Sequence, residues 1–369
     1  MSIYLTDYRT AHATHVDLFD EIVYPQRAYW FPELFAKKDT GLIYVPHKLA
    51  EKVLDAQLLK SLRDRAGKTA FIFASGNAHL AGINPYAIKK SRLTYDYKLL
   101  PLTLTQVYAG RIGQMCGADD LITTDASACA SSLKAMSDVF QLMTYQGFDR
   151  VCVLGVEDTI NDKVLHFFGE SGACLTADKE EQGIKPSAFD KHNGGFYIGQ
   201  GAVFAVFESE RVAQNAQARL LGAGVASERS TNAIGQRDDG EGFVRASAIA
   251  FRNSNTSPGE INIVKTHGTG TKSNNVSEKA ALQALFHTPF VATSFKQIIG
   301  HTMGASGLLE TCLLLDSLKS GIVPAIPNRT ENDTVYLSEP ITIKRKPKIL
   351  SQAAGMGNIY AAAIFDTQV

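Results

Sequence analysis

The sequence predicts an α/β fold, because short apolar runs of strand length alternate with segments of helical periodicity along most of the chain. The strand-like runs lie at residues 70–74, 121–124 and 151–156, and again at 261–264, 290–293 and 360–365. Segments with apolar residues at helical spacing separate them. Strands that alternate with helices are typical of crossover units around a largely buried sheet. We therefore expect two similar α/β halves.

The first half is expected to span residues 1–208 and to close with a long apolar run at residues 195–208. Its best-defined helix follows the strand candidate at 121–124. Apolar side chains there recur at the spacing of one helix face, at Leu133, Met136, Val139, Phe140 and Met143. The buried strand candidate at 151–156 comes next, so this helix is expected to connect two strands.

The second half, residues 209–369, is expected to have a similar order of elements. It begins near residues 219–222, and its first strand candidate lies at 261–264. Helical runs at 278–286 and 307–318 then alternate with the strand candidates at 290–293 and 360–365. The alternation again favours a largely buried sheet.

The composition is ordinary for a globular protein and excludes several classes of function. Of 369 residues, 45% are hydrophobic and 20% are charged, and 37 Lys and Arg balance 37 Asp and Glu. A net charge near zero gives no bulk attraction to nucleic acid or to an anionic membrane. No apolar run reaches the roughly 18 residues of a membrane span, and the N-terminus lacks the pattern of a signal peptide. We expect no nucleic-acid partner and no membrane span.

The cysteines predict a reduced protein. The chain has five of them, an odd number, and no pair has the spacing of a zinc or redox motif. A disulfide framework is therefore not expected, and the cytoplasm is the expected location.

One cysteine, Cys129, has the surroundings of a nucleophile. It lies in a run of small residues between a strand candidate and the helix that carries Leu133. Small neighbours leave room for a substrate to approach the sulfur. At or near a helix N-terminus, backbone N–H groups and the helix dipole stabilise a thiolate. Because a buried free cysteine is often just a small hydrophobe, Cys129 alone leaves both interpretations open.

Two histidine motifs follow downstream, each after a strand-like run. His267 lies in a loop rich in glycine and threonine, and His301 lies in a second small-residue loop between Lys296 and Glu310. A neutral imidazole can donate a hydrogen bond to an oxygen that gains negative charge during a reaction. The two motifs and the cysteine together favour catalytic roles over structural ones.

Taken in this order, the motifs resemble the β-ketoacyl synthase family, the condensing enzymes of fatty-acid and polyketide synthesis. The resemblance is to the elongating branch, which uses Cys, His and His. It runs from about residue 109 to the C-terminus, with further matching segments at residues 109–112, 199–202, 239–242 and 355–358 and with Glu278. The resemblance implies a thiolase-like duplicated fold with five layers, α-β-α-β-α.

The resemblance also implies a decarboxylative Claisen condensation. Cys129 would accept an acyl group, and a malonyl-type extender would then lose CO2. His267 and His301 would stabilise the resulting enolate. Lys296 would hold the charge balance of the site by pairing with Glu310.

Further residues receive supporting roles from the same resemblance. The backbone N–H groups of Cys129 and Met356 would form an oxyanion hole, with the glycines Gly355 and Gly357 letting the chain approach closely. Two hydroxyls would contact the pantetheine arm of the substrate, those of Thr269 and Thr271. No metal or redox cofactor is expected, because the substrates arrive on the phosphopantetheine of an acyl carrier protein.

The chain departs from the family pattern at several positions. Met356 stands where the family has an aromatic gate of the acyl pocket, Asn275 replaces an acidic residue, and Gln200 replaces a glutamate. The region before about residue 69 matches least. These departures favour a specialised polyketide or unusual fatty-acyl pathway over a housekeeping elongase.

Two alternatives remain at this stage. The chain could be one subunit of a ketosynthase/chain-length-factor heterodimer, or an acyltransferase that uses the same cysteine without decarboxylation. The expected partners are an acyl carrier protein and a second copy of the chain. Carrier proteins are acidic, so a basic cluster is expected to dock them, with two candidates: Lys60, Arg63 and Arg65, or Lys89, Lys90 and Arg92.

Overall fold

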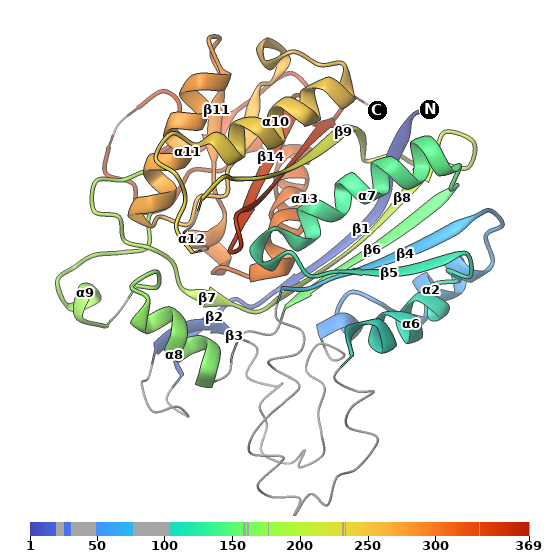
Figure 1. Cartoon of the computed structure of the whole chain (residues 1–369), viewed down its shortest axis with the longest axis horizontal. Helices are drawn as coiled ribbons and strands as arrows, with labels where there is room; N and C mark the ends of the chain where they lie inside the picture. The colour runs from blue at the N-terminus through green and yellow to red at the C-terminus, as the bar shows by residue number, and fades with distance from the viewer. Residues whose placement is uncertain are drawn as a thin grey trace, which may run out of the picture.

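The computed structural model describes residues 1–19, 26–30, 49–76, 104–157, 160, 162–175, 177–230, 232, 234–331 and 333–368. Their largest element is a ten-stranded sheet that runs through the molecule (Figure 1). Its strands lie in the order β11-β10-β14-β15-β9-β1-β8-β6-β4-β5.

Each half of the chain supplies five adjacent strands. The N-terminal half supplies β1 (Ile3–His12), β4 (Thr69–Ala74), β5 (Leu121–Asp125), β6 (Arg150–Glu157) and β8 (Gly201–Ser209). The C-terminal half supplies β9 (Ala218–Ser227), β10 (Ile263–Lys265), β11 (Val291–Thr293), β14 (Lys348–Gly355) and β15 (Ile359–Asp366).

The two sets of strands have the same topology. Numbered in chain order within each set, both read 1-5-4-2-3 across the sheet. In both, the second strand is parallel to the third and fourth, and the fifth is antiparallel to the first and fourth. The first strands, β1 and β9, pair antiparallel and join the sets. This repetition confirms the predicted duplication.

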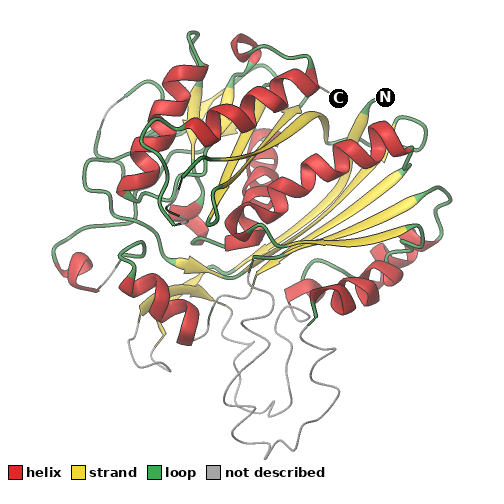
Figure 2. Ribbon diagram, viewed as in Figure 1, coloured by secondary structure: helices red, strands yellow, loops and turns green. Residues whose placement is uncertain are grey.

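Helices add three layers to the two halves of the sheet (Figure 2). The central layer, between the halves, holds α7 (Ser131–Gln146) and α13 (Ser306–Lys319). One outer layer holds α2 (Ala56–Arg63) and α6 (Thr105–Met115). The other holds α10 (Glu241–Ser254) and α11 (Lys272–Leu285). The expected α-β-α-β-α architecture is therefore confirmed.

Successive side chains of a strand point to opposite faces of the sheet, and in β4 both sets are apolar and buried. In β4, the rings of Phe71 and Phe73 pack with the outer helices, whereas Ala70 and Ile72 face the central layer. A strand buried on both faces needs apolar residues at every position, which is why it reads as a continuous apolar run.

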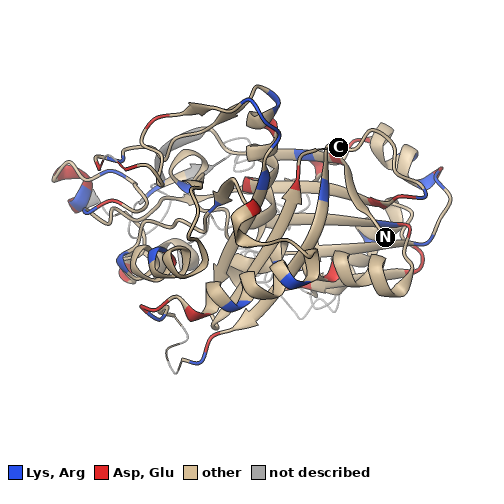
Figure 3. Ribbon diagram, turned by 90° about the horizontal axis from the view of Figure 1, so that it is seen from above, with Lys and Arg blue, Asp and Glu red and all other residues tan. Residues whose placement is uncertain are grey.

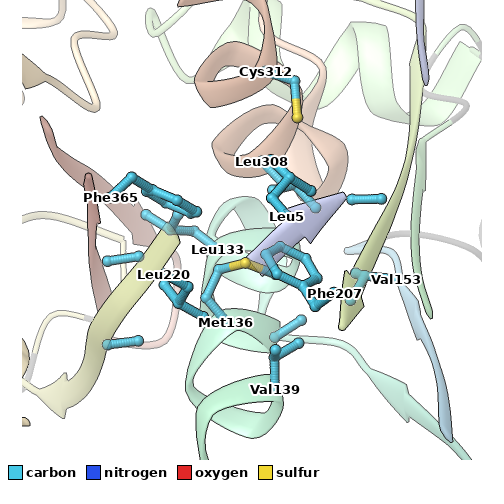
Figure 4. Packing of buried hydrophobic residues seen from close by; sticks show 14 of the residues in the cluster. Leu5, Leu133, Met136, Val139, Val153, Phe207, Leu220, Leu308, Cys312 and Phe365 are labelled. Atoms are coloured by element: carbon cyan, nitrogen blue, oxygen red, sulfur yellow. The ribbon is translucent and has the colours of Figure 1, made fainter. Parts of the chain in front are cut away.

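The central core lies where α7 and α13 meet the inner faces of the strands (Figure 4). Leu133 and Met136 of α7, Leu308 of α13, and Phe207 and Phe365 of the strands converge there. Burial of such side chains contributes about 1.5–3 kcal/mol each, so this core is a main source of stability.

Shorter elements complete the structure. A three-stranded sheet contains β2 (His15–Phe19), β3 (Gln26–Trp30) and β7 (Ile198–Gly199), and β12 (Ile322–Val323) pairs with β13 (Ile341–Thr342). The short helices are α8 (Asp162–Glu170), α9 (Ala177–Glu181) and α12 (Lys296–Ile299). Short 3-10 turns lie at Ala128–Ala130, Pro258–Glu260 and Met303–Ala305.

The strands and helices expected from apolar patterns are all present. Several further elements have no predicted counterpart, among them β1, β9, β14, α2, α6 and α10. In β1, Asp7 and Arg9 interrupt the apolar pattern and a bulge lies between Leu5 and Asp7, so its periodicity is irregular. The N-terminal segment that seemed least family-like thus supplies a strand at the centre of the sheet.

The N-terminal ends of α7 and α13 touch at the centre of the molecule. Ser132 Oγ donates to the carbonyl oxygen of Ala305 (3.0 Å) and accepts the N–H of Leu308 (3.1 Å). A Cβ on Gly307 would lie 2.6 Å from the Cβ of Leu133, so glycine is required for this approach.

Both helices begin in the same unusual way. Each follows a three-residue 3-10 turn whose first residue has a positive φ, 48° at Ala128 and 41° at Met303. Non-glycine residues rarely adopt this conformation, and it costs of order 1–3 kcal/mol. The duplication therefore extends to a strained turn at the start of each central helix.

Basic and acidic residues are interspersed along the outer helices and loops (Figure 3). Within the part of the chain that the structure describes, no helix is both long and apolar enough to cross a membrane.

Leu308 provides a test of the central core. Leu308→Ala should lower the free energy of unfolding by about 2–5 kcal/mol, because the side chain is fully buried and its removal leaves a cavity. Leu104→Ala, which truncates a leucine that is 47% exposed, is the matched control and should cost well under half as much. Urea unfolding followed by circular dichroism measures both. Equal costs would contradict the assignment of the core.

Candidate active site

The strained turn before α7 carries Cys129. The chain leaves β5 at Asp125, and the turn places Cys129 two residues before the first residue of α7. Its side chain is 8% exposed and lies in a small apolar cluster with Phe168, Phe196 and Met303. Cys129 Sγ is 3.6 Å from Met303 Sδ, an atom of the matching turn before α13. The two turns are therefore in contact through the side chains of Cys129 and Met303.

His267 follows β10 in a loop held by a buried carboxylate. Glu278 of α11 accepts the backbone N–H of His267 (2.6 Å) and of Gly268 (2.9 Å). The carbonyl oxygen of Gly268 accepts Ser294 Oγ (3.1 Å) and Gln297 Nε2 (2.9 Å). These contacts fix the backbone of the loop and therefore the direction of the His267 side chain.

His301 is held by pairing with the strand β7. Its N–H donates to the carbonyl oxygen of Tyr197 (2.7 Å), and its own carbonyl oxygen accepts the N–H of Gly199 (3.0 Å). The ring packs edge-on against Phe196, with 4.9 Å between centroids. The centroids of the His267 and His301 rings are 5.7 Å apart, so the structure brings the two histidines together.

The buried carboxylate of Glu310 pairs with two lysines. Lys296 Nζ donates to Glu310 Oε1 (2.8 Å), which is the pairing expected from the sequence. Lys265 Nζ donates to Glu310 Oε2 (3.2 Å), and Ser306 Oγ also donates to Glu310. Although burial opposes ionisation of Glu310, the two ammonium groups hold the pKa of its carboxyl below the ordinary value.

A narrow cavity of about 110 Å³ opens beside the cysteine and the two histidines. Seven of the ten residues expected at the site line it: Cys129, His267, Thr269, Thr271, His301, Gly355 and Met356. Lys296 and Glu310 lie fully buried rather than on the cavity wall, and Gly357 lies in the turn after Met356 with a φ of 87°.

The loop around Met356 approaches the cysteine turn closely. A Cβ on Gly355 would lie 2.6 Å from the carbonyl oxygen of Ser127, so glycine is required at this position. Thr269 Oγ1 and Thr271 Oγ1 lie 3.0 Å apart on another part of the wall. The cavity lining therefore combines apolar groups with the two imidazoles, the two threonines and further polar residues such as Gln236 and Asn358.

The resting cysteine is a thiol and not the thiolate that its place before a helix suggests. Burial raises the pKa of the Cys129 thiol to about 12, although the Lys296 ammonium opposes this shift. The carboxylates of Glu157 and Glu310 add to it. Desolvation among apolar side chains therefore outweighs the nearby ammonium charge.

Both imidazoles are neutral. Burial lowers the pKa of His267 and of His301 well below the ordinary value, and the ammonium groups of Lys296 and Lys265 lower both further. Among the described residues, neither Nδ1 atom has a hydrogen-bond partner. A neutral imidazole carries one N–H, so each ring can donate one hydrogen bond to a ligand.

Sequence reasoning missed three residues that touch the site. Met303 contacts the cysteine sulfur, and Glu157 accepts the N–H groups of Gly76 (2.7 Å) and Gly304 (3.0 Å) close to both turns. Lys265 had a signal in the sequence, because it ends a short apolar strand two residues before His267. A lysine at the end of a buried strand needs a partner, and that partner is Glu310.

The first basic cluster expected to dock a carrier protein is partly paired with acidic residues. Lys60 pairs with Asp64 and Arg65 pairs with Glu208, so part of the charge of the cluster is neutralised. The second cluster, Lys89, Lys90 and Arg92, lies outside the described residues. Among the residues that the structure does describe, no group of three or more His, Cys, Asp or Glu could hold a metal ion.

Comparison with protein families gives two matches. Residues 47–213 match the family model of the β-ketoacyl synthase N-terminal domain, and residues 217–330 match that of the β-ketoacyl synthase C-terminal domain. The two matches meet along the chain between β8 and β9, where the chain passes from the first set of strands to the second.

Curated relatives carry related names. A putative polyketide β-ketoacyl synthase 1 of Streptomyces cyaneus is 25% identical over 69% of this chain and 63% of its own length. A putative mitochondrial 3-oxoacyl-[acyl-carrier-protein] synthase of Schizosaccharomyces pombe is 26% identical over 73% of this chain and 66% of its own. The chain thus spans slightly less than two thirds of both relatives.

Solved structures resemble the whole chain. A ketosynthase with its chain length factor from Xenorhabdus doucetiae has a TM-score of 0.81 at 17% identity, with coverage of 99% of this chain and 98% of the other. The ishigamide ketosynthase/chain length factor has a TM-score of 0.79 at 20% identity, covering 100% and 99%. At these identities the likeness establishes the fold.

The raised pKa of Cys129 predicts how its alkylation depends on pH. The rate of modification by iodoacetamide should keep rising through the neutral and alkaline range, since the fraction of reactive thiolate keeps growing until the pH approaches the pKa of about 12. Lys296→Met should react more slowly at each pH, because the lost ammonium favoured the thiolate. Mass spectrometry of the Cys129 peptide measures both, with the buried Cys312, which is absent from the cavity lining, as the internal control. A rate that levels off near neutral pH would reveal a resting thiolate and refute this account.

Proposed function

Because the chain belongs to the β-ketoacyl synthase family, we propose that it catalyses a decarboxylative Claisen condensation between two thioesters. One substrate is an acyl group loaded on Cys129, and the other is a malonyl-type unit on an acyl carrier protein. The observation that carries the proposal is the convergence of Cys129, His267 and His301 on one cavity, although they come from distant parts of the chain.

In the first half-reaction, Cys129 takes the acyl group. Its sulfur attacks the thioester carbonyl carbon, and the pantetheine thiol leaves with the proton that the cysteine loses. The backbone N–H groups of Cys129 and Met356 are the proposed oxyanion hole. The close approach of the Gly355 loop to the cysteine turn supports this pairing.

In the second half-reaction, the extender loses CO2 and an enolate forms on its thioester. The proposed roles of His267 and His301 are to donate hydrogen bonds to the enolate oxygen, which the neutral state of both rings supports. Each such donor typically contributes about 2.7–4 kcal/mol to transition-state stabilisation. The enolate carbon then attacks the acyl carbonyl, and Cys129 leaves as a thiolate that takes up a proton from water to return to the resting thiol.

The remaining site residues support these steps. Lys296 and Glu310 are proposed to set the charge beneath the site, and their buried ion pair supports this. Thr269 and Thr271 are proposed to contact the pantetheine arm, because their hydroxyls line the cavity. Phosphopantetheine is the prosthetic group of the carrier and enters with the substrate.

The proposed partners are an acyl carrier protein and a second copy of the chain, with a chain-length-factor heterodimer as the alternative. Similar structures include a type II polyketide acyl-carrier protein in complex with its ketosynthase, and two ketosynthases with chain length factors. We propose that the halves divide at residues 208 and 209, that the protein acts in a specialised polyketide or unusual fatty-acyl pathway, and that it is cytoplasmic.

Alanine variants separate the two half-reactions. Cys129→Ala should abolish acyl loading with the fold intact. His267→Ala and His301→Ala should each keep loading but lose condensation by about 10²–10³-fold, because only condensation builds an enolate. Intact-mass analysis follows loading, and labelled CO2 release follows decarboxylation. His287→Ala, at an exposed histidine, is the matched control. Condensation at the control rate by either site variant would remove that histidine from the mechanism.

Met356 is the proposed gate of the acyl pocket. Met356→Phe should keep the chemistry, because the backbone N–H remains, but should change which acyl lengths load on Cys129. A stiff ring cannot adapt its shape as a thioether can. The measurement is the loading rate across a series of acyl lengths for both proteins. Superimposable length profiles would show that the gate lies elsewhere.

A further inference from the structure

Lys265 is a buried lysine that the proposed mechanism does not use. Burial lowers the pKa of its ammonium group, and the Glu310 carboxylate opposes this shift. Its side chain has no exposed surface, and Nζ donates to Glu310 Oε2 (3.2 Å) and to the carbonyl oxygen of Gln352 (3.0 Å). Lys296 occupies the other oxygen of Glu310. One carboxylate therefore balances two ammonium groups, which is an expensive arrangement in a desolvated site and calls for an explanation.

The position of Lys265 links it to the histidines. It lies two residues before His267, at the end of β10, and the Glu310 that it holds lies on α13, the helix that follows His301. Within the described part of the chain, Lys265 of β10 and Lys296 of α12 act on the charge of the two rings. Glu310 of α13 pairs with both lysines, and Glu278 of α11 accepts the backbone N–H of His267. Glu157 of β6 faces the cysteine turn on the other side.

We propose that Lys265 is a positioning residue for the condensation step, completing a two-lysine cluster on Glu310 that adds to burial in disfavouring a positive charge on either imidazole beside the extender's carboxylate. This inference rests on the proposed function. An excess positive charge beneath the rings disfavours a second positive charge on them. A protonated ring would instead attract the extender's carboxylate and so oppose the loss of CO2.

The two lysines are expected to act on different half-reactions. Lys296 lowers the pKa of Cys129 and also that of both histidines. Lys265 acts with Lys296 on the two histidines. Loss of the Lys265 charge should therefore disturb condensation while the pH dependence of acyl loading stays the same.

The sign of the effect follows from the charge. Removing a nearby cation makes protonation of an imidazole easier, so the pKa of His267 and His301 should rise towards the ordinary value. As the pH is lowered, the rate of condensation should then begin to fall at a higher pH than in the wild type. A residue that acted only by packing would lower the rate by the same factor at every pH.

The experiment compares Lys265→Gln, which removes the charge but keeps a donor for Gln352, with Lys265→Arg, which keeps the charge. NMR of the imidazoles gives their titration without any activity, and decarboxylation and acyl loading are measured across pH. Lys279→Gln, which removes a lysine charge over the Tyr336 ring, is the control. We expect Lys265→Gln to move the histidine titration and the acidic limb of decarboxylation to higher pH, with Lys265→Arg and the control like wild type.

An unchanged histidine titration in Lys265→Gln would overturn the inference while leaving the proposed function intact. Conversely, a shifted titration in a protein whose wild type releases no CO2 would support the charge effect and reject the function. If thermal unfolding shows that Lys265→Gln does not fold, Lys265→Met is the second variant. Should both fail to fold, the wild-type titration decides, because an imidazolium on either residue at neutral pH contradicts the proposal.

Discussion

The close contact between the N-terminal ends of α7 and α13 is the constraint on which the site depends. Ser132 bridges the two helices, and Gly307 allows them to touch. Because each helix begins with a strained turn, the contact brings the two turns together, with Cys129 of one against Met303 of the other. The cysteine and the two histidines meet as a consequence of how the halves pack.

Burial at this junction decides the charge of each group. The cysteine is a thiol and the imidazoles are neutral, because desolvation there penalises every charged form. The exceptions are groups that pair, and Glu310 stays ionised because two ammonium groups hold it. A site of this kind suits a reaction that generates negative charge on a substrate oxygen, since fixed N–H donors are worth most where water is excluded.

The sequence predicted more of the architecture than of the electrostatics. Runs such as residues 70–74 and 151–156 become strands because both of their faces are buried, and that burial leaves a clear apolar signal. β1 gave a weak signal, since Asp7 and Arg9 interrupt it. The motifs located the cysteine and histidines, but the protonated state of Cys129 depends on the residues packed around it, which no local pattern records. The ion pair of Lys265 leaves no local pattern, because its partner Glu310 lies 45 positions later in the chain.

The central claim is that one cavity loads an acyl group and then extends it. The direct test is to give the wild-type protein an acyl-carrier protein, remove the excess, add malonyl-carrier protein, and follow both proteins by intact mass. The account predicts an acyl adduct on Cys129 that disappears as an extended β-ketoacyl group appears on the carrier with release of CO2. An adduct that persists, or that returns to the carrier without extension, would contradict it.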